Sequence, residues 1–254
     1  MQGENYWHSS VPDREQFFRE RDEILSVLAQ AEDLRQTALG LLREANSMGF
    51  SHKNTWLGVP IIRLPEDMLL QQELIWSEKP DVIIEIGVAR GGGLIFNASM
   101  QHLSGLIPNV IGIDNKIYPH THEAISKCSF SNHIKVLEGH STSLGIRAAL
   151  ETLLVGANKV LLILDSDHSA SHVLDELRAY VPLLPKSSLV IVCDTIIDEQ
   201  PPNTYPNRTW SDGRGPSHAI SEFMRHSGEL DFYYVNENRS LVLSEIRNGI
   251  LVKV

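Results

Sequence analysis

Short β-branched and aliphatic runs recur from residue 82 onward, and longer segments of helical or loop character separate them. Five of the runs are predicted strands: Val82–Ile86, Val110–Asp114, Ile134–Leu137, Val160–Leu164 and Leu189–Val192. Near-continuous apolar strands that alternate with helices are typical of a doubly wound α/β fold, whose mostly parallel sheet is covered on both faces. Three later runs, at residues 232–235, 241–243 and 249–252, are expected to add an antiparallel edge.

The first 53 residues follow a different pattern. Residues 13–47 carry apolar side chains at helical spacing with charged side chains between them, which predicts one long helix. Such a helix packs on its own domain or contacts another subunit, and its long apolar stripe favours a role in oligomerisation. Residues 54–65 include two prolines and read as a linker, and residues 66–76 read as a short amphipathic helix.

The composition limits the classes of protein to consider. The 254 residues, 42% of them hydrophobic, suffice for one substantial core with an appendage. The net charge of -10 disfavours nucleic acid as a partner, because an acidic surface repels phosphate groups. A polar N-terminus without a long apolar run predicts a cytoplasmic protein with no membrane segment. The two cysteines form no CxxC pair, which argues against zinc and redox motifs.

The first strand of the core leads into a glycine-rich segment, Glu85-Ile86-Gly87-Val88-Ala89-Arg90-Gly91-Gly92-Gly93. A helix is expected to begin near Leu94, and its free N–H groups and positive dipole end favour a ligand at the glycines. The spacing differs from the GxGxxG dinucleotide motif. It matches the looser acidic-x-Gly-x-x-x-Gly pattern of loops that bind S-adenosylmethionine (SAM). An ordinary tight turn is the alternative.

The next two strands end in further candidate ligands for a nucleoside. Asp114 ends the second strand, about 20 residues beyond the glycines, where a carboxylate can accept hydrogen bonds from both ribose hydroxyls. His140 and Ser141 follow the third strand, where contacts to adenine are expected. The combination of glycines and Asp114 favours a nucleoside-type cofactor over a simple turn.

Acidic side chains also follow the fourth and fifth strands. Asp165 and Asp194 are expected at the same rim of the sheet, where two converging carboxylates hold a hard cation or repel each other. Mg²⁺ prefers such oxygen ligands, and in a methyl transfer it would orient the acceptor oxygen. His168 lies three residues beyond Asp165 and is a candidate for the base that deprotonates the acceptor hydroxyl. The alternative is that His168 only caps or packs the following helix.

A rival interpretation of the same segment is a non-haem iron site. Facial triads use two histidines and one carboxylate, and Asp165, His168 and His172 offer that set. His168 and His172 are four residues apart on an expected helix, so they would share a face. Because Asp165 and Asp194 already account for the rim, we interpret His172 as a residue of the helix surface.

The segment at residues 197–216 is rich in Pro, Asn and Gly and follows the fifth strand. A long loop at this position is expected to cover the site as a lid, with Tyr205, Arg208 and Trp210 lining an acceptor pocket. A disordered surface insertion is the alternative, which the Tyr and Trp disfavour.

These residues together carry a resemblance. The blocks TWLGVPIIRLPEDM, EIGVARGGGLIFNAS, VIGIDNKIYPH, EGHSTS, LLILDSDHSASHVLDELRAYVPLL and CDTIIDE resemble, in order, the cephalosporin hydroxylase family from about residue 54 to the C-terminus. The resemblance implies a class I methyltransferase fold, SAM, Mg²⁺ and O-methylation of sugar hydroxyls or natural products, and some members are linked to oligomers. It places Glu85, Gly87, Gly91 and Asp114 at SAM positions and Asp165 and Asp194 at metal positions. The site is also similar to that of catechol O-methyltransferases, where a lysine base stands in place of His168.

One position departs from the family pattern. The family usually has a carboxylate directly before the second metal aspartate, and this chain has Cys193 there. A neutral thiol is a soft, poor ligand for Mg²⁺, so the site is expected to bind Mg²⁺ weakly, to have shifted to a softer metal or to work without metal. Cys193 is equally interpretable as a small buried hydrophobe.

These observations predict an N-terminal helical extension over residues 1–53 and a SAM-dependent O-methyltransferase domain over residues 54–254. The expected acceptor is a small molecule, and the expected assembly is a dimer or a larger homo-oligomer. Two other functions stay open: an iron oxygenase component with the Asp165, His168 and His172 set, and a non-catalytic partner protein with a lost metal site at Cys193.

Overall fold

The computed structural model describes residues 14–208, 210, 214–226, 232–234 and 242–254. In chain order its elements are α1 (Arg14–Gln30), α2 (Glu32–Ser47), η2 (Phe50–Lys53), β1 (Thr55–Trp56), β2 (Val59–Pro60), α3 (Pro65–Glu78), β3 (Val82–Ile86), α4 (Gly92–Leu103), β4 (Val110–Asp114), α5 (Pro119–Lys127), η3 (Ser131–His133), β5 (Ile134–Glu138), α6 (Leu144–Leu153), β6 (Val160–Leu164), α7 (Ala170–Tyr180), η4 (Val181–Leu183), β7 (Leu189–Val192), η5 (Thr195–Glu199), α8 (Pro216–His226), β8 (Phe232–Tyr234) and β9 (Ile250–Lys253).

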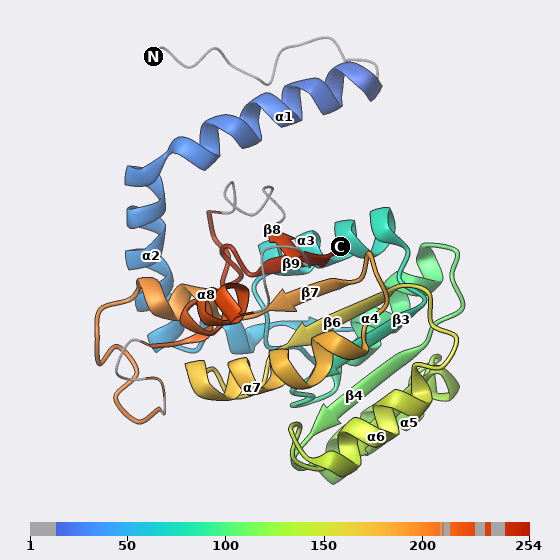
Figure 1. Cartoon of the computed structure of the whole chain (residues 1–254). Helices are drawn as coiled ribbons and strands as arrows, with labels where there is room; N and C mark the ends of the chain where they lie inside the picture. The colour runs from blue at the N-terminus through green and yellow to red at the C-terminus, as the bar shows by residue number, and fades with distance from the viewer. Residues whose placement is uncertain (1–13, 209, 211–213, 227–231, 235–241) are drawn as a thin grey trace.

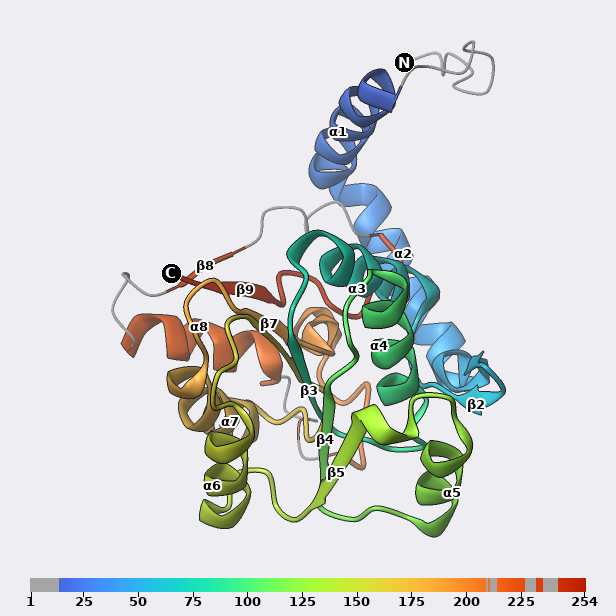
Figure 2. The same ribbon diagram turned by 90° about the vertical axis from the view of Figure 1, so that its right-hand side faces the viewer.

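A seven-stranded sheet in the order β5-β4-β3-β6-β7-β9-β8 forms the centre of the molecule. The strands from β5 to β7 pair in parallel, and β9 pairs antiparallel with both β7 and β8. Helices α3, α4 and α5 cover one face and α6, α7 and α8 cover the other (Figure 2). The predicted doubly wound, mostly parallel α/β fold is confirmed.

The apolar strands bury both faces of the sheet, as their composition predicts. Along β3, Ile84 and Ile86 join the core beneath α6, α7 and α8, whereas Ile83 joins the core beneath α3 and α4. Because side chains alternate across a strand, Glu85 points to the same face as Ile83. The Glu85 carboxylate is therefore buried on the face of the sheet that α3 and α4 cover.

The N-terminal region forms two helices where the sequence predicts one. The break lies at Ala31, whose ψ of 69° is not helical, and α2 turns away from α1 there (Figure 1). No proline or glycine marks this break. Its physical reason is packing, because the turn lets Leu39 and Leu42 of α2 bury against Leu64 and Ile196. No helix in the described part of the chain is long and apolar enough to cross a membrane.

Two other predictions of local structure are wrong. Residues 54–65 are not a plain linker, because β1 and β2 form an antiparallel hairpin closed by Leu57 and Gly58, both with positive φ. Val242 and Leu243 form a bend instead of a strand, and residue 241 lies outside the described residues. The neighbouring Ser244 and Glu245 bond to Asp67 of α3, which ties this segment to a helix rather than to the sheet edge.

Candidate functional site

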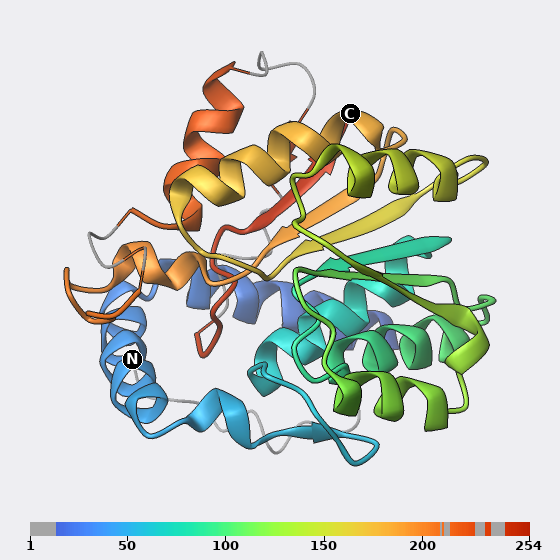
Figure 3. The same cartoon turned by 90° about the horizontal axis from the view of Figure 1, so that it is seen from below.

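The carboxyl ends of the parallel strands meet at one edge of the sheet, and the chain order reverses there between β3 and β6. From β3 the chain continues to β4 on one side, and later to β6 on the other. In open α/β sheets such a reversal leaves a crevice beyond the strand ends in which ligands bind. Figure 3 shows α2 and the segment after β7 beside each other near this edge.

The glycine-rich segment connects β3 to α4 in close contact with the end of β6. Gly87 has a φ of +99°, and a Cβ atom there would collide with the backbone carbonyl of Asp165. The two strands are joined by the hydrogen bond from Asp165 N to Ile86 O at 2.8 Å. Gly91, with a φ of +87°, is the N-cap of α4. The glycines are thus required by backbone conformation and by the approach of Asp165.

Asp114, at the end of β4, holds the glycine-rich segment from the other side. Its Oδ2 accepts hydrogen bonds from the backbone N–H groups of Val88 at 2.9 Å and Ala89 at 3.3 Å. Its Oδ1 accepts one from Lys116 N at 3.2 Å. A carboxylate has about four acceptor positions, so Asp114 retains capacity for a ligand hydroxyl.

Two adjoining cavities lie on this edge. The first, which we call the loop cavity, has a volume of about 430 Å³. The second, the carboxylate cavity, has a volume of about 360 Å³. The loop cavity is lined by side chains that include Asp114, Asn115, His140, Ser141, Ser166 and His172. The carboxylate cavity is lined by side chains that include Arg63, Glu85, His168, Asp194, Tyr205 and Glu245. Both are lined by Gly87, Ala89, Asp165, Arg208 and Trp210, so they are parts of one crevice.

A buried carboxylate organises the floor of the loop cavity. Glu176 of α7 is fully buried, and its Oε1 lies 2.6 Å from Ser141 Oγ, 2.7 Å from Ser166 Oγ and 2.9 Å from His172 Nε2. The hydrogen bond to Glu176 raises the pKa of His172. His172 also packs edge-on against His140, with ring centroids 5.5 Å apart. His172 therefore faces the cavity and is not a helix-surface residue.

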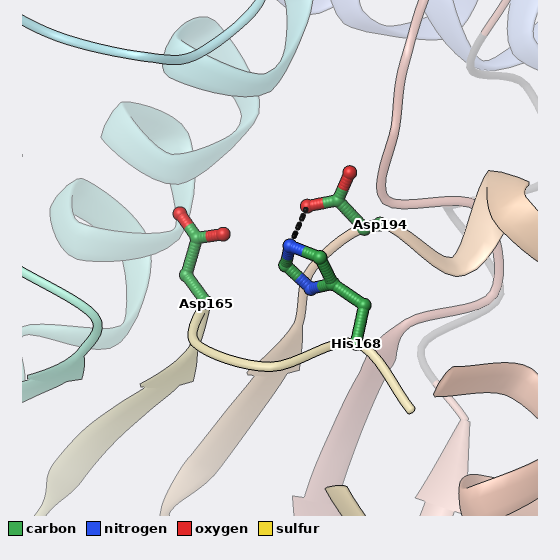
Figure 4. A group of neighbouring side chains, drawn as sticks. All are labelled: Asp165, His168 and Asp194. Atoms are coloured by element: carbon green, nitrogen blue, oxygen red, sulfur yellow. Dashed lines mark ion pairs between the residues drawn. The ribbon is translucent and has the colours of Figure 1, made fainter. Parts of the chain in front are cut away.

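Asp165, His168 and Asp194 come together in the carboxylate cavity. One ligand atom from each lies within 4.8 Å of the others. The imidazole of His168 lies between the two carboxylates, with Nε2 3.5 Å from Asp194 Oδ2 (Figure 4). Asp165 and His168 follow β6 and Asp194 follows β7, and these strands are parallel neighbours. His172 is not in this group, so the structure does not assemble the alternative iron triad.

Burial and mutual repulsion set the protonation of this cluster. Burial, together with the nearby Asp165, raises the pKa of Asp194 well above its ordinary value. Burial lowers the pKa of His168 below 6.5, so the imidazole is neutral near pH 7. A neutral imidazole beside carboxylates is able to accept a proton from a bound hydroxyl.

Arg63 is a member of the site that the sequence analysis missed. It lies between β2 and α3, is only 4% exposed, and donates from Nη2 to Asp165 Oδ2 at 2.9 Å. The same nitrogen lies 3.5 Å from Glu85 Oε1. Glu85 in turn accepts a hydrogen bond from Asn97 at 2.7 Å, and burial raises its pKa to about 7. The sequence did not indicate a role for Arg63, because the arginine lies in a segment that reads as a linker. Only the hairpin of β1 and β2 brings it to the edge of the sheet where the site lies.

Glu245 and Asn46 were also missed. Asn46, near the end of α2, donates from Nδ2 to Glu245 Oε1 at 2.7 Å, and both side chains line the carboxylate cavity. Burial, followed by the charge of Asp194, raises the pKa of Glu245 to about 8. The buried Asn46 Oδ1 has no hydrogen-bond partner among the described residues. These two residues stand far apart in the sequence and belong to no motif.

The structure places Tyr205, Arg208 and Trp210 against the carboxylate cavity. The ring of Trp210 packs edge-on against His168 with centroids 4.9 Å apart, and the Arg208 guanidinium lies 5.4 Å from the Trp210 ring. The buried Trp210 Nε1 has no hydrogen-bond partner in the described part of the chain. Burial raises the pKa of Tyr205 to about 12, so its phenol is protonated and able to donate.

Cys193, between β7 and Asp194, is 4% exposed and belongs to the apolar cluster beneath α3 and α4. Burial raises the pKa of its thiol well above 9. A neutral, buried thiol is not a ligand for a hard cation, and Cys193 behaves as a small hydrophobe.

The crevice fits the cofactor and the cation that the sequence analysis anticipated. The volume and lining of the loop cavity suit a nucleoside: backbone of the glycine-rich segment, the Asp114 carboxylate and the ring of His140. Asp165 and Asp194 provide two carboxylates, and Mg²⁺ is commonly bound through one or two carboxylates while it keeps several waters. The fold and site together define a class I SAM-dependent methyltransferase.

Residues 48–254 match the family model of rhamnosyl O-methyltransferase/CmcI. The rhamnosyl O-methyltransferase of Mycobacterium leprae is 27% identical over 201 residues, which are 78% of this chain and 82% of that protein. Its namesake in Mycobacterium tuberculosis is 29% identical over 173 residues, 67% of this chain and 66% of that protein. The chain thus spans just under two thirds of the tuberculosis relative.

Solved structures of CmcI share the fold. One, described as Mg-SAM, has a TM-score of 0.53 and 18% identity, and the match covers 80% of this chain and 77% of that one. An apo-structure of CmcI has a TM-score of 0.57 and 20% identity, with 81% and 77% covered. The chain belongs to the rhamnosyl O-methyltransferase/CmcI family. The predicted family and its class of enzyme, the SAM-dependent O-methyltransferases, are confirmed.

Proposed function

We propose that this chain methylates a hydroxyl group of a glycosylated or similar small natural product, with SAM in the loop cavity and the acceptor in the carboxylate cavity. The observation that carries this proposal is the position of Asp165. It lines both cavities, and it belongs to the group with His168 and Asp194. A methyl donor and a hydroxyl acceptor would therefore meet beside two carboxylates and a neutral imidazole.

The nucleoside half of the cofactor site consists of residues with fixed positions. Asp114 offers acceptor capacity to the ribose hydroxyls, while Gly87 and Gly91 let the backbone approach the cofactor. His140 and Ser141, which line the same cavity, would contact adenine. Glu85 would support the glycine-rich segment from its buried side, because its carboxylate packs against Gly93 and accepts a hydrogen bond from Asn97. SAM, when bound, supplies an electrophilic methyl group to an acceptor oxygen held in line.

His168 is the proposed base. Its imidazole is neutral near pH 7 and lies between Asp165 and Asp194, so an acceptor hydroxyl held by either carboxylate would be beside it. Asp165 and Asp194 would hold Mg²⁺, which lowers the pKa of a coordinated hydroxyl and orients it. The Trp210 ring packs against His168 and would help to hold it in place.

The acceptor is proposed to be a polyol such as a glycosyl group. The relatives in Mycobacterium carry the name rhamnosyl O-methyltransferase. In this chain the carboxylate cavity also has several polar groups suited to hydroxyls: Asn46, Glu245, Tyr205 and Arg208. The described part of residues 197–216, which supplies Tyr205, Arg208 and Trp210, is proposed as the lid that selects the acceptor. Residues 209 and 211–213 of that segment lie outside the described residues.

A homo-oligomer built with the N-terminal helices is proposed as well. The side chains of Phe17 and Val27 on α1 are 54% and 66% exposed, which is unusual for apolar residues on a helix that serves only its own domain. Size-exclusion chromatography with light scattering, on the full chain and on a variant with both residues changed to Ser, tests this. A monomeric full chain would contradict it.

The test of the activity begins with calorimetry of S-adenosylhomocysteine (SAH) binding to the purified chain. SAM is then incubated with a panel of glycosides, including methyl α-L-rhamnoside, and formation of SAH is followed with added Mg²⁺ or with EDTA. We expect SAH to bind, and turnover with at least one glycoside that EDTA reduces. Absence of SAM and SAH binding would refute the proposal, and turnover only with non-glycosidic hydroxyls would refute the acceptor class.

A further inference from the structure

Arg63 brings a permanent positive charge to the carboxylate cavity. Its guanidinium donates to Asp165 Oδ2 at 2.9 Å and lies 3.5 Å from Glu85 Oε1, within a site where Arg63 itself is 4% exposed. An arginine stays protonated in proteins, so Asp165 is already paired with a cation before any metal arrives. Asp165 is also one of the two carboxylates expected to hold Mg²⁺.

The position of this arginine is fixed. Arg63 Nη1 donates to the Gln71 side chain, whose amide donates in turn to Asn97. Gln71 and Asn97 are both fully buried, and Asn97 closes the chain by donating to Glu85. A side chain held at both ends of such a network cannot swing out of the site when another cation approaches.

Of the groups that surround the Arg63 guanidinium, Asp165 interacts with its charge most directly. Glu85 is the other acidic partner, and it is shared with Asn97 and lies at the longer distance. The shorter, better hydrogen bond of Arg63 is the one to Asp165, which faces the cavity with 21% of its side chain exposed.

We propose that Arg63 acts as a built-in cation, whose charge keeps the affinity of Asp165 and Asp194 for a divalent cation low. This rests on the proposed function in assigning the cation to these two aspartates. Two positive charges that compete for the same carboxylates repel each other, most strongly where water is excluded. A purely structural arginine would have the opposite effect, since its loss would disorder Asp165 and weaken cation binding.

The two roles predict opposite changes in the Kd for Mg²⁺ when the charge of Arg63 is removed, so measuring this Kd distinguishes them. Mg²⁺ binding, with Mn²⁺ as a second probe, is measured by calorimetry on the full chain and on Arg63→Gln, which removes the charge. Gln71→Glu cancels the same charge in a second way, because it places a carboxylate beside Arg63 Nη1. This carboxylate would come from α3 and would not face the cavity. Arg63→Lys is the matched control that keeps the charge. We expect Kd for Mg²⁺ to fall by about tenfold in Arg63→Gln and in Gln71→Glu, and to change little in Arg63→Lys.

Each outcome has a defined meaning. Unchanged or weaker Mg²⁺ binding in both charge-removing variants overturns the proposal, as does the lack of Mg²⁺ binding in every variant. If neither variant folds, the Mg²⁺ affinity of Arg63→Lys tests the proposal. A clear loss of affinity in this variant, which keeps the charge, would mean that the geometry of Arg63 and not its charge determines Mg²⁺ binding. SAH binding is measured on the same samples. Failure of every protein to bind SAH would refute the proposed function separately.

Discussion

Asn46 and Glu245 are joined by a 2.7 Å hydrogen bond across 199 residues of sequence, and both face the carboxylate cavity. The contact connects the end of α2 to the segment before β9. Helix α2 therefore contributes directly to the wall of the site, in addition to any role between subunits. The acceptor specificity is accordingly expected to depend on α2.

Glu245→Ala and Asn46→Ala are expected to raise KM for the acceptor by roughly tenfold each, because each variant loses a side chain that can hydrogen-bond an acceptor hydroxyl in a buried setting. The Kd for SAH should stay unchanged, since neither residue lines the loop cavity. Steady-state kinetics and calorimetry measure the two quantities. Glu44→Ala, on the exposed side of α2, is the matched control. An equal loss of SAH affinity would mean that both residues maintain the structure of the site and do not contact the acceptor specifically.

His168→Gln is expected to lower kcat by roughly 10² to 10⁴-fold, the usual contribution of a general base. Glutamine keeps much of the packing against Trp210 but accepts no proton, so the Kd for SAH should be retained. The measurement is a single-turnover rate with saturating SAM, with exposed His133→Gln as control. A variant with undiminished rate would leave deprotonation to another group.

Asp67→Asn is expected to change how stability depends on pH. Burial raises the pKa of Asp67 to about 7, from 3.8 in the unfolded chain. Between these values the folded state holds a proton that the unfolded state has lost, so this group makes the free energy of unfolding fall as pH rises from about 4 to 7. Asparagine mimics the neutral acid, because its oxygen can accept from Glu245 N and its amide can bond to Ser244 Oγ.

The variant should therefore gain stability relative to the wild type between pH 5 and pH 8, by roughly 3 kcal/mol. Urea unfolding at both pH values measures this difference. Asp81→Asn is the contrast: burial raises the pKa of Asp81, but hydrogen bonds from Asn158 and Lys159 outweigh this and lower it. Asp81→Asn should thus lose stability at pH 8. The same pH response in both variants would be inconsistent with this account.

Gly87→Ala is expected to abolish SAH binding and to lower the Tm. The new Cβ would collide with the Asp165 carbonyl, and the φ of +99° is strained for alanine. Gly145→Ala is the control, because nothing surrounds that position in α6 and the helix should gain about 0.5 kcal/mol. Thermal unfolding and SAH calorimetry measure both variants. Normal SAH affinity in Gly87→Ala would mean that the segment tolerates rearrangement.

Local patterns predict the sheet well because its strands are buried on both faces. The runs that became β3, β4 and β6 have the predicted bounds. The N-terminal helices were harder to predict. The break at Ala31 follows from the burial of Leu39 and Leu42 against Leu64 and Ile196, which are distant in sequence, and no local signal records it.

The sequence by itself determined the glycine-rich segment and the carboxylates at the strand ends. Parallel strands place their ends at one edge, so residues such as Asp114, Asp165 and Asp194 can be located from strand order alone. Only the tertiary structure decided which other groups surround them. Arg63, Asn46 and Glu245 come from a hairpin, a helix and a C-terminal segment without periodicity or motif. Their meeting depends on how these elements pack on the sheet, and that packing sets the charge around Asp165.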